Sequence, residues 1–307
     1  MKAAYFMRHG GPEVFQYGDL PDPVAGPDDV MVDVHAASVN GADWRVRQGT
    51  YRPVAHFPYV PGRDFSGIVA AIGTGVRDFT PGDPVFGVCE VGQEGAYAEK
   101  IAIKAGIIAR KPASLSHPDC AALALTGLTA MVSIEDTLNL KSGETILIQG
   151  GAGGVASIAI QLAKHIGAKV ITTAGAANHA YVRALGADVV IDYHAQDFTR
   201  EAANCDAVFD TVGGEVAARS FTVLRPGGRA AFIASGSSAP AAPRTDVVSL
   251  RPNVLRDRAH LERLMALVLA GAVRPPEITL YPLSQAASAH AVSEGRHLRG
   301  KLVLKVR

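Results

Sequence analysis

The chain has 307 residues, enough for about two domains of ordinary size. Hydrophobic residues make up 48% and charged residues 19%, which excludes a disordered tail, and the length excludes a minimal disulfide scaffold. The 30 Lys and Arg residues nearly balance the 29 Asp and Glu residues, leaving a formal net charge of +1. Because no overall field draws such a chain to nucleic acid or anionic lipid, we expect a small-molecule partner.

The sequence predicts neither a secretion signal nor a membrane span. Residues 1–15 have no apolar core of signal-peptide length, and the apolar stretch 120–134 is too short and too interrupted to cross a bilayer. Three cysteines lie far apart, at Cys89, Cys120 and Cys205, and an odd number argues against a disulfide framework. We therefore expect a soluble protein of the cytoplasm.

The first 117 residues have the pattern of β-structure. Strand-like runs bounded by Gly, Pro or Asp occur at 30–38, 66–73, 83–88 and 96–103. We expect these runs to form a compact, mostly antiparallel barrel. After Gly271 the pattern is β-like again, with runs at 278–283 and 300–306 on either side of a short Ala-rich helix at 285–293.

From about Pro118 to Gly271 strands alternate with helices. The expected strands are 145–150, 169–174, 188–192, 206–211 and 229–234, and the expected helices begin near Gly153, Asn178 and Glu215. Such alternation predicts a parallel sheet with helical crossovers.

The strongest local motif is TILIQGGAGGVAS, in which an apolar strand runs into a glycine cluster and then a helix. The first amides of that helix lack intrahelical partners and form a cradle for phosphate. The motif predicts that dinucleotide binds at Gly150, Gly151, Ala152, Gly153, Gly154 and Val155, with Ala156 in the third glycine position of GxGxxG. The alternative is an ordinary glycine-rich turn. A Walker-type loop is disfavoured because no Gly-Lys-Ser/Thr follows.

The segment after the second strand of this unit predicts the choice of cofactor. An NAD site normally offers an acidic residue about 20 residues after the glycines, for the ribose hydroxyl. From Thr145 through Ala187 the chain has no carboxylate, and the strand instead opens into Thr173, Gly175 and His179. We expect NADP(H), with Lys169, His179 or Arg183 near a 2'-phosphate. The alternative for these basic residues is a solvated helix face, which is the better interpretation for Arg183.

No metal site is predicted. A catalytic zinc needs three closely arranged Cys, His or carboxylate ligands, and a structural zinc usually needs four thiolates. The three cysteines and ten histidines form neither pattern. Without a Lewis acid, oxidation of a simple alcohol through its alkoxide is disfavoured.

Several segments, taken in order, span essentially the whole chain: GGPEVF at 10–15, ASVNGADWRVRQGTY at 37–51, VPGRDFSGIV at 60–69, GDPVFG at 82–87, GAYAEK at 95–100, LALTGLTA at 123–130, GGAGGVA at 150–156, LGADVVIDY at 185–193, FDTVGG at 209–214, LRPGGR at 224–229 and HLRGKLVLKV at 297–306. In order and spacing the chain resembles the medium-chain dehydrogenase/reductase superfamily, and within it the zinc-independent quinone oxidoreductase group that includes zeta-crystallin-like proteins. Asn40 and Arg63 stand where the zinc-dependent members have Cys and His.

The resemblance implies an α/β protein with two domains. It implies a GroES-like catalytic domain at 1–117 and 272–307, with a doubly wound Rossmann NADP(H)-binding domain at 118–271 between them, and a homodimer.

The resemblance also implies site residues. Asn40 and Tyr51 match positions beside the nicotinamide and substrate, and Thr126 matches a threonine near the carboxamide. Tyr193 matches a tyrosine near the 2'-phosphate, and His179 stands where many relatives carry Lys. The resemblance further implies that Ile233, Ala234, Ser235 and Lys301 border the cofactor. The alternatives are a turn cap for Asn40, an edge-strand aromatic for Tyr51 and a strand-end aromatic for Tyr193.

The resulting hypothesis is a reductase in which NADPH delivers hydride to a quinone or conjugated enone held between the two domains. Conjugated acceptors need no metal, because donors such as Tyr51, the Asn40 amide or water stabilise the developing enolate. One alternative is a 2-alkenal or enoyl-thioester reductase with the same hydride geometry. The alternative from another class is an NADPH-binding structural or redox-sensing protein with little turnover.

Overall fold

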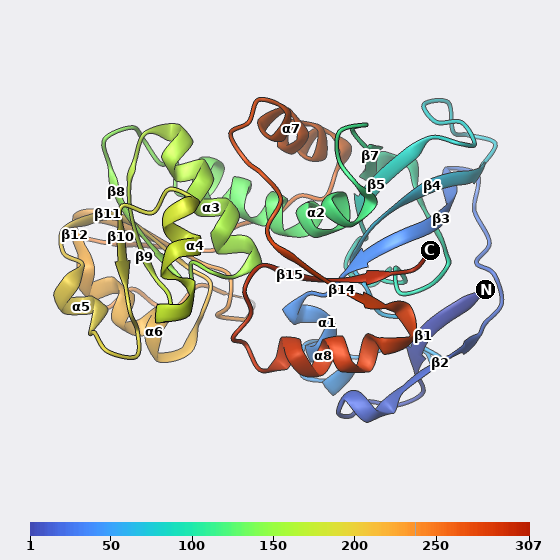
Figure 1. Cartoon of the computed structure of the whole chain (residues 1–307), viewed down its shortest axis with the longest axis horizontal. Coiled ribbons are helices and arrows are strands. Elements are labelled where there is room, and N and C mark those ends of the chain that lie inside the picture. Colours follow the sequence, from blue (N-terminus) through green and yellow to red (C-terminus); the bar gives the residue numbers. More distant parts are fainter. Residues whose placement is uncertain (237) are drawn as a thin grey trace. The chain divides into compact units, whose positions relative to one another are not determined.

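The computed structural model in Figure 1 describes residues 1–236 and 238–307 in two compact units. The β-rich unit comprises Met1–Leu125, Arg256–Met265 and Pro275–Arg307. The parallel-sheet unit comprises Thr126–Leu255 and Ala266–Arg274. The domain limits expected from the sequence, 1–117 with 272–307 and 118–271, stay a prediction.

A seven-stranded sheet organises the β-rich unit. Its order is β14-β15-β3-β4-β5-β7, and β6 pairs with β3. Pairing is antiparallel except between β14 and β15, and the C-terminal strand β15 completes the sheet against β3. Val30, Val32 and Val34 alternate along β3 and are fully buried in the core. The strands are β3 Asp29–Ser38, β4 Asp64–Ile72, β5 Pro84–Val88, β6 Lys100–Lys104, β7 Ile108–Arg110, β14 Ile278–Pro282 and β15 Lys301–Lys305.

The strand expected at 96–103 is shorter in the structure. Only Lys100–Lys104 forms β6, and the preceding residues are held individually. The Tyr97 N–H donates to the Pro61 carbonyl at 3.0 Å, and Ala98 makes an isolated bridge with Ala3.

The sequence pattern did not predict helix α1, Gly41–Gln48. The segment has no apolar stripe at helical spacing, so periodicity gives no signal. The helix is defined by its ends instead: the Asn40 N–H donates to Asp43 Oδ2 at 2.9 Å, and Gly49 ends the helix at φ 77°. This start places Asn40 directly before the first helical turn.

The remaining elements of this unit are small. Strands β1 Lys2–Phe6 and β2 Phe15–Asp19 form a separate antiparallel pair, and α8 spans Ala286–Glu294. Short 3-10 turns lie at η1 Pro12–Val14, η2 Ala105–Ile107 and η6 Leu283–Gln285.

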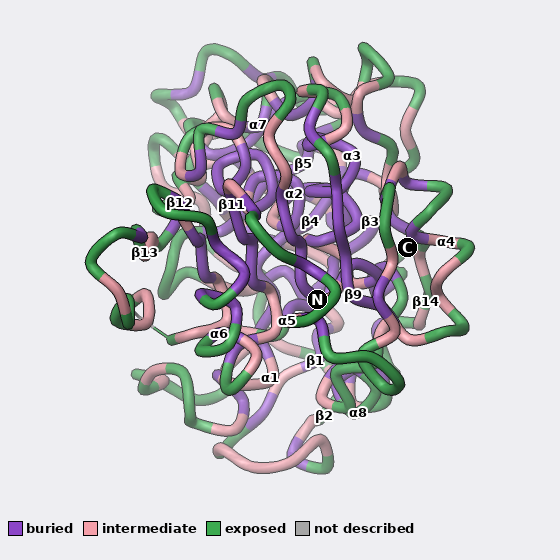
Figure 2. The backbone as a smooth tube through the Cα atoms, turned by 90° about the vertical axis from the view of Figure 1, so that its left-hand side faces the viewer, coloured by how far each residue is buried: buried purple, intermediate pink, exposed green. Residues whose placement is uncertain are grey.

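A six-stranded parallel sheet forms the centre of the other unit. Its order is β10-β9-β8-β11-β12-β13, so the chain starts at β8, winds outward to β10, and then winds the other way. This is the doubly wound order of a dinucleotide-binding fold, and it confirms the expected fold class. Figure 2 shows buried backbone along β9 and β11. The strands are β8 Thr145–Gln149, β9 Lys169–Thr173, β10 Val189–Ile191, β11 Cys205–Asp210, β12 Leu224–Phe232 and β13 Val248–Leu250.

Helices connect these strands. They are α3 Gly154–Ile166, η4 Ala176–Asn178, α4 His179–Ala184, α5 Phe198–Glu201, α6 Gly214–Ser220 and η5 Phe221–Val223. Helix α2, His117–Met131, continues into the π-helix η3, Val132–Thr137, and α7 spans Arg258–Leu269.

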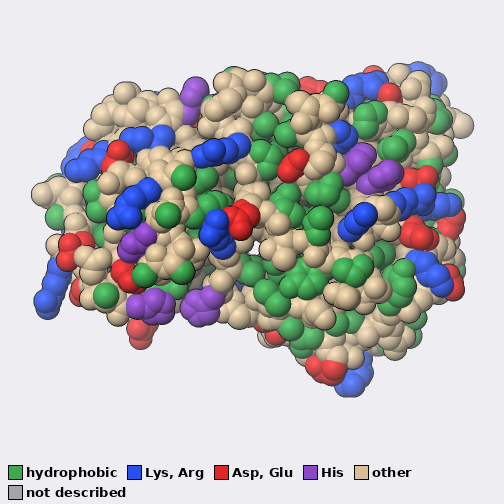
Figure 3. Space-filling view, in the orientation of Figure 1, with side chains coloured by type: hydrophobic (Ala, Val, Ile, Leu, Met, Phe, Trp, Pro, Cys, Tyr) green, Lys and Arg blue, Asp and Glu red, His purple; other side chains and the backbone are tan. Residues whose placement is uncertain are grey.

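The surface is mixed in charge, as the composition predicts. On the face shown in Figure 3, Lys and Arg side chains are interspersed with Asp and Glu side chains. Among the described residues, no helix has both the length and the apolar character needed to span a membrane.

Candidate active site

The glycine loop after β8 is held by contacts that only glycine permits. Gly150 has φ 74°, and its N–H donates to Thr173 Oγ1 at 3.0 Å. A Cβ on Gly151 would lie 2.2 Å from Thr172 Oγ1, so a side chain there displaces the loop. At Gly153 a Cβ would meet only the Gly150 carbonyl, at 3.4 Å. The outer side of the loop is therefore open to a ligand.

Helix α3 follows this loop directly, and its first amide groups have no partner within the helix. Its N-cap is Gly153, which has no side chain to accept from them. The Ser157 N–H donates to the Gly153 carbonyl at 2.8 Å, so the amides of Gly154, Val155 and Ala156 precede the first intrahelical bond. Three free amides at the positive end of a helix fit a pyrophosphate.

The end of β9 and the segment after it bring some predicted residues together. The Thr173 hydroxyl is buried and donates to Gln149 Oε1 at 2.7 Å, so it supports the loop. A Cβ on Gly175 would lie 3.5 Å from the Tyr193 hydroxyl, and Tyr193 is 45% exposed. His179 Nε2 lies 3.1 Å from the Ala174 carbonyl. Gly175, His179 and Tyr193 thus gather at the carboxyl edge of the sheet.

Lys169 was wrongly expected near a 2'-phosphate. It is the first residue of β9, whereas the glycine loop follows the last residue of β8. The two strands are parallel, so Lys169 lies at the opposite edge of the sheet. The sequence pattern predicted the strand correctly. It did not show that Lys169 lies at the amino end of that strand, away from the glycine loop.

Residues 233–235 follow β12 at the same edge as the loop. Asp210 on β11 pairs with Gln149 on β8 and with Phe232 on β12. The Ile233 N–H donates to the Asp210 carbonyl at 3.1 Å, and the Ser235 hydroxyl donates to the Ser238 carbonyl at 2.8 Å. Ala234 packs closely against Gly213, where a Cβ would lie 2.8 Å from its carbonyl oxygen. Thr126 is a buried residue of α2.

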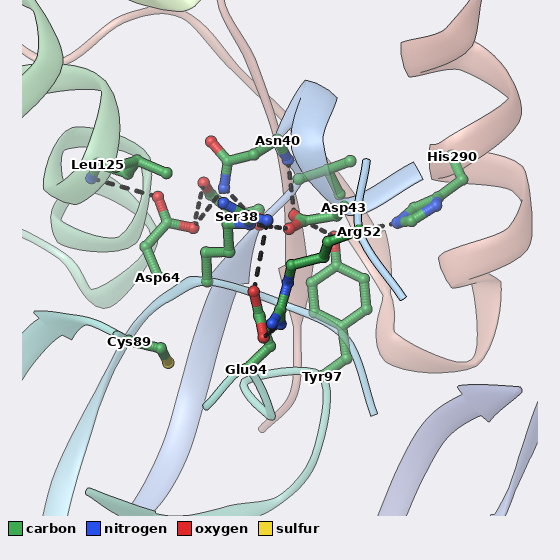
Figure 4. Close-up of polar contacts among 12 residues, drawn as sticks. Ser38, Asn40, Asp43, Arg52, Asp64, Cys89, Glu94, Tyr97, Leu125 and His290 are labelled. Atoms are coloured by element: carbon green, nitrogen blue, oxygen red, sulfur yellow. Dashed lines mark hydrogen bonds and ion pairs between the residues drawn. The ribbon is translucent and has the colours of Figure 1, made fainter. Parts of the chain in front are cut away.

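Figure 4 shows a buried polar cluster in the β-rich unit, around Asn40. The Asn40 amide donates to Asp64 Oδ1 at 2.9 Å, and Asn40 Oδ1 accepts from Lys301 Nζ at 2.9 Å. Ser38 also donates to Asp64, at 2.7 Å, and Lys301 donates to the Val39 carbonyl at 2.7 Å. Burial lowers the pKa of Lys301, against the field of Asp64. The hydrogen bond from Lys301 therefore fixes the orientation of the Asn40 side chain.

A second part of this cluster consists of Arg63 and the two carboxylates beside it, Asp43 and Glu94. The Arg63 guanidinium is 2% exposed and lies 3.3 Å from Asp43 and 3.4 Å from Glu94. Burial opposes its charge, but Asp43 and Glu94 raise the pKa of Arg63 above its ordinary value. The guanidinium stands 4.7 Å from the ring centroid of Tyr51, which is 44% exposed. Tyr51 thus presents one ring face to a buried cation and stays partly exposed.

Glu94 also has partners of its own. It accepts a hydrogen bond from the Tyr59 hydroxyl at 2.7 Å and forms an ion pair with Arg52. Burial, followed by the Glu94 charge, raises the pKa of Tyr59 above its ordinary range.

A hydrogen-bond chain runs from α1 through α8 to Asp43. Arg47 is only a donor, so its Nη1 donates to His290 Nδ1 at 3.2 Å. His290 then carries its proton on Nε2 and donates to the Tyr97 hydroxyl at 3.2 Å, which donates to Asp43 Oδ2 at 3.2 Å. Burial, aided by Arg47, lowers the pKa of His290 to about 3, which keeps it neutral. Burial raises the pKa of Asp43 to about 6, against the field of Arg63.

Sequence reasoning missed this chain. His290 and Tyr97 are 193 positions apart, and although Tyr97 lies in the GAYAEK segment, no spacing in the sequence links it to His290. Only the return of the C-terminal segment to the first strands brings them together.

The donor set of this cluster does not fit a zinc ion. Where the zinc-dependent members carry Cys and His, Asn40 bonds to Lys301 and Arg63 places a guanidinium between carboxylates. The Cys89 thiol is buried, and burial raises its pKa, so it does not supply a thiolate. Over residues 1–236 and 238–307, no three His, Cys, Asp or Glu side chains are grouped to hold a metal.

Family models match both parts of the chain. Residues 26–113 match the alcohol dehydrogenase GroES-like domain, and residues 185–304 match the zinc-binding dehydrogenase domain. The chain is 32% identical to an NADPH-dependent alkenal/one oxidoreductase from the chloroplast of Arabidopsis thaliana, over 99% of this chain and 79% of the relative.

Solved structures match along the full length. The quinone oxidoreductase from Coxiella burnetii has 35% identity and a TM-score of 0.93, covering 100% of this chain and 99% of its own. The Escherichia coli quinone oxidoreductase, solved as a complex with NADPH, has 28% identity and a TM-score of 0.91, with 100% of both chains covered.

Proposed function

The chain belongs to the zinc-independent quinone oxidoreductase group of the medium-chain dehydrogenase/reductase superfamily, and from this premise we propose that it is an NADPH-dependent reductase of quinones and related conjugated carbonyl compounds. The observation that carries the proposal is the open glycine loop, from which the free amides of α3 extend, in a chain with full-length similarity to such reductases. When bound, NADPH supplies the hydride.

For cofactor binding we assign the pyrophosphate to the loop 150–155 and the free amides of α3. The absence of any carboxylate from Thr145 through Ala187 favours a 2'-phosphate over a free hydroxyl, near Thr173, Gly175, His179 and Tyr193. The nicotinamide end is assigned to Thr126 and to Ile233, Ala234 and Ser235. Lys301 supports the site through Asn40, to which it donates.

For the reduction step we assign the substrate-facing donor role to Tyr51. Its ring packs on the Arg63 guanidinium and the residue is 44% exposed, so a substrate can reach it, and we assign its hydroxyl to stabilising negative charge that develops on a carbonyl oxygen. Asn40 remains a proposed site residue. Because its amide atoms already bond to Lys301 and Asp64, we assign it to orienting the site.

The test is NADPH consumption with 1,2-naphthoquinone, with a 2-alkenal and with an enoyl thioester, each compared with NADH. We expect the quinone to be reduced and NADPH to be preferred. Reduction of the alkenal alone would move the assignment to alkenal reductase, the activity in the name of the Arabidopsis relative. Cofactor binding without turnover on any acceptor would favour the structural or redox-sensing protein instead.

We further propose a homodimer working in the cytoplasm, with the two domains divided as the sequence predicts. The three cysteines are buried and unpaired, which suits a reducing compartment. Analytical ultracentrifugation tests the dimer, cell fractionation tests the compartment, and limited proteolysis near residues 117 and 271 tests the division.

A further inference from the structure

Arg256 reaches into the neighbourhood of Arg63 from the segment before α7. Its Nη1 donates to the Cys89 carbonyl at 2.6 Å, and the Cys89 N–H donates to the Arg63 carbonyl at 2.6 Å. Cys89 directly follows β5, whose last residue, Val88, pairs with Asp64 at the start of β4. The guanidinium of Arg256 is therefore anchored beside the backbone that carries Arg63 and Asp64.

Arg256 differs from the other arginines of this cluster because it has no counter-ion. Arg63 has Asp43 and Glu94, and Arg52 has Glu94. Throughout the described part of the chain, Arg256 has only the Cys89 carbonyl as acceptor and no carboxylate within ion-pair distance. Its remaining N–H groups are free for a ligand.

The surroundings make this unpaired charge costly. Arg256 is only partly exposed, and its burial, together with the charge of Arg63, lowers its pKa. The positive charges of Arg256 and Arg63 repel each other, and an anion bound to Arg256 would relieve that repulsion. A planar guanidinium binds a carboxylate with two parallel hydrogen bonds.

We propose that Arg256 is a substrate-binding residue that recognises a carboxylate, so that the preferred acceptors are conjugated enones carrying a carboxylate group. This inference rests on the proposed function, because it names the substrate class of that reductase. Tyr51 and Arg256 then divide the substrate between them: Tyr51 faces the carbonyl that is polarised, and Arg256 holds the remote anion.

The reaction balances with the components already proposed. In trans-4-oxo-2-pentenoate, carbon 2 accepts a hydride, the π-electron pair of the double bond moves to carbon 3 and the ketone, and a proton from solvent adds at carbon 3. The product is 4-oxopentanoate, and NADPH is oxidised to NADP⁺. The carboxylate is unchanged in this step, so its contribution is to binding.

The experiment compares trans-4-oxo-2-pentenoate with its methyl ester, which has the same conjugated ketone but no charge. We expect the wild-type protein to have a KM for the acid about 10- to 100-fold below that for the ester, as for a charge-assisted hydrogen bond. Arg256→Gln should abolish this preference by raising the KM for the acid alone, and Arg256→Lys should restore part of it. Arg77→Gln is the charge-matched control, because Arg77 is exposed and, among the residues that the structure describes, bonds only to the carbonyls of Thr74 and Val76.

Binding without turnover separates this inference from the proposed function. Calorimetric titration of the NADP⁺-loaded protein with 4-oxopentanoate and with its methyl ester should show the same preference, and Arg256→Gln should remove it. If no acceptor is reduced but 4-oxopentanoate binds through Arg256, the proposed function fails and the anion site stands. Equal KM and affinity for acid and ester in the wild-type protein, or equal loss for both in Arg256→Gln, would overturn the inference.

Discussion

The glycine loop and the buried cluster around Arg63 are built in opposite ways. The loop is local: β8, the glycines and α3 follow one another within 145–166, and its ligand groups are backbone amides. The side chains of the cluster come from α1, from β4, from the segment that holds Glu94 and Tyr97, from α8 and from β15. The loop depends on glycines and on backbone amides that are free to bind a ligand. The cluster depends on buried charges that neutralise one another. The two regions should therefore fail in different ways when altered.

The largest effect is expected from Arg63→Gln. Losing this cation leaves Asp43 buried without its counter-charge and leaves Glu94 with Arg52 as its remaining cation, so the free energy of unfolding should fall by about 3–5 kcal/mol. Urea unfolding measures this loss, and the exposed Arg77→Gln serves as the control. A loss no greater than the control's would mean that the cluster is not held by its charges.

Gly151→Val should damage binding more than folding. The new Cβ would meet Thr172 Oγ1 at 2.2 Å, and overpacking of about 1–3 kcal/mol, relieved by movement of the loop, weakens NADPH binding by about 10- to 100-fold. Fluorescence titration with NADPH measures the affinity. Gly106→Ala is the control, since a Cβ there meets nothing within 4 Å. Unchanged affinity in Gly151→Val would contradict the assignment of the loop.

His290→Gln should change how stability depends on pH. The pKa of His290 is about 3 in the folded protein and 6.5 ordinarily, so its unfolded form binds a proton between these values and the folded form does not. Stability is then lost as pH falls below 6.5, and this group accounts for about 2 kcal/mol between pH 6.5 and 5.

Urea unfolding at pH 7.5, 6.5 and 5 makes the measurement. His117, whose pKa burial lowers to about 4, acts in the same direction, and Asp43, whose pKa is raised to about 6, acts in the opposite one. Both groups are present in wild type and variant, so the difference between the two curves isolates His290. Parallel curves would show that His290 is not held neutral.

The smallest effect is expected from Tyr51→Phe, which keeps the ring over Arg63 and removes only the hydroxyl. We expect kcat for quinone reduction to fall about tenfold, with the free energy of unfolding unchanged, because one neutral hydrogen-bond donor is lost at an exposed site. A wild-type rate in Tyr51→Phe would contradict a role for the hydroxyl and would leave Tyr51 only a packing role.

Local pattern predicted one region far better than the other. The strand, glycine cluster and helix of 145–166 appear in the structure within a residue or so of their expected limits, since periodicity and glycine chemistry act over short spans. The same reasoning missed α1, which is fixed by Asn40, Asp43 and Gly49 instead of an apolar stripe. It also placed Lys169 at the wrong end of β9, because the sequence predicts a strand but not which edge of the sheet a residue reaches.

The sequence by itself determined the α/β fold, the open glycine loop and the family, since these depend on residue types at short spacing and on the order of motifs along the chain. The tertiary structure decided what surrounds Asn40 and Tyr51. Lys301 and His290 come from the last segment of the chain, and Arg256 from a segment before it, to meet residues of the first hundred. Their energies depend on burial and on distances between charges, and both quantities exist only once distant segments have packed together.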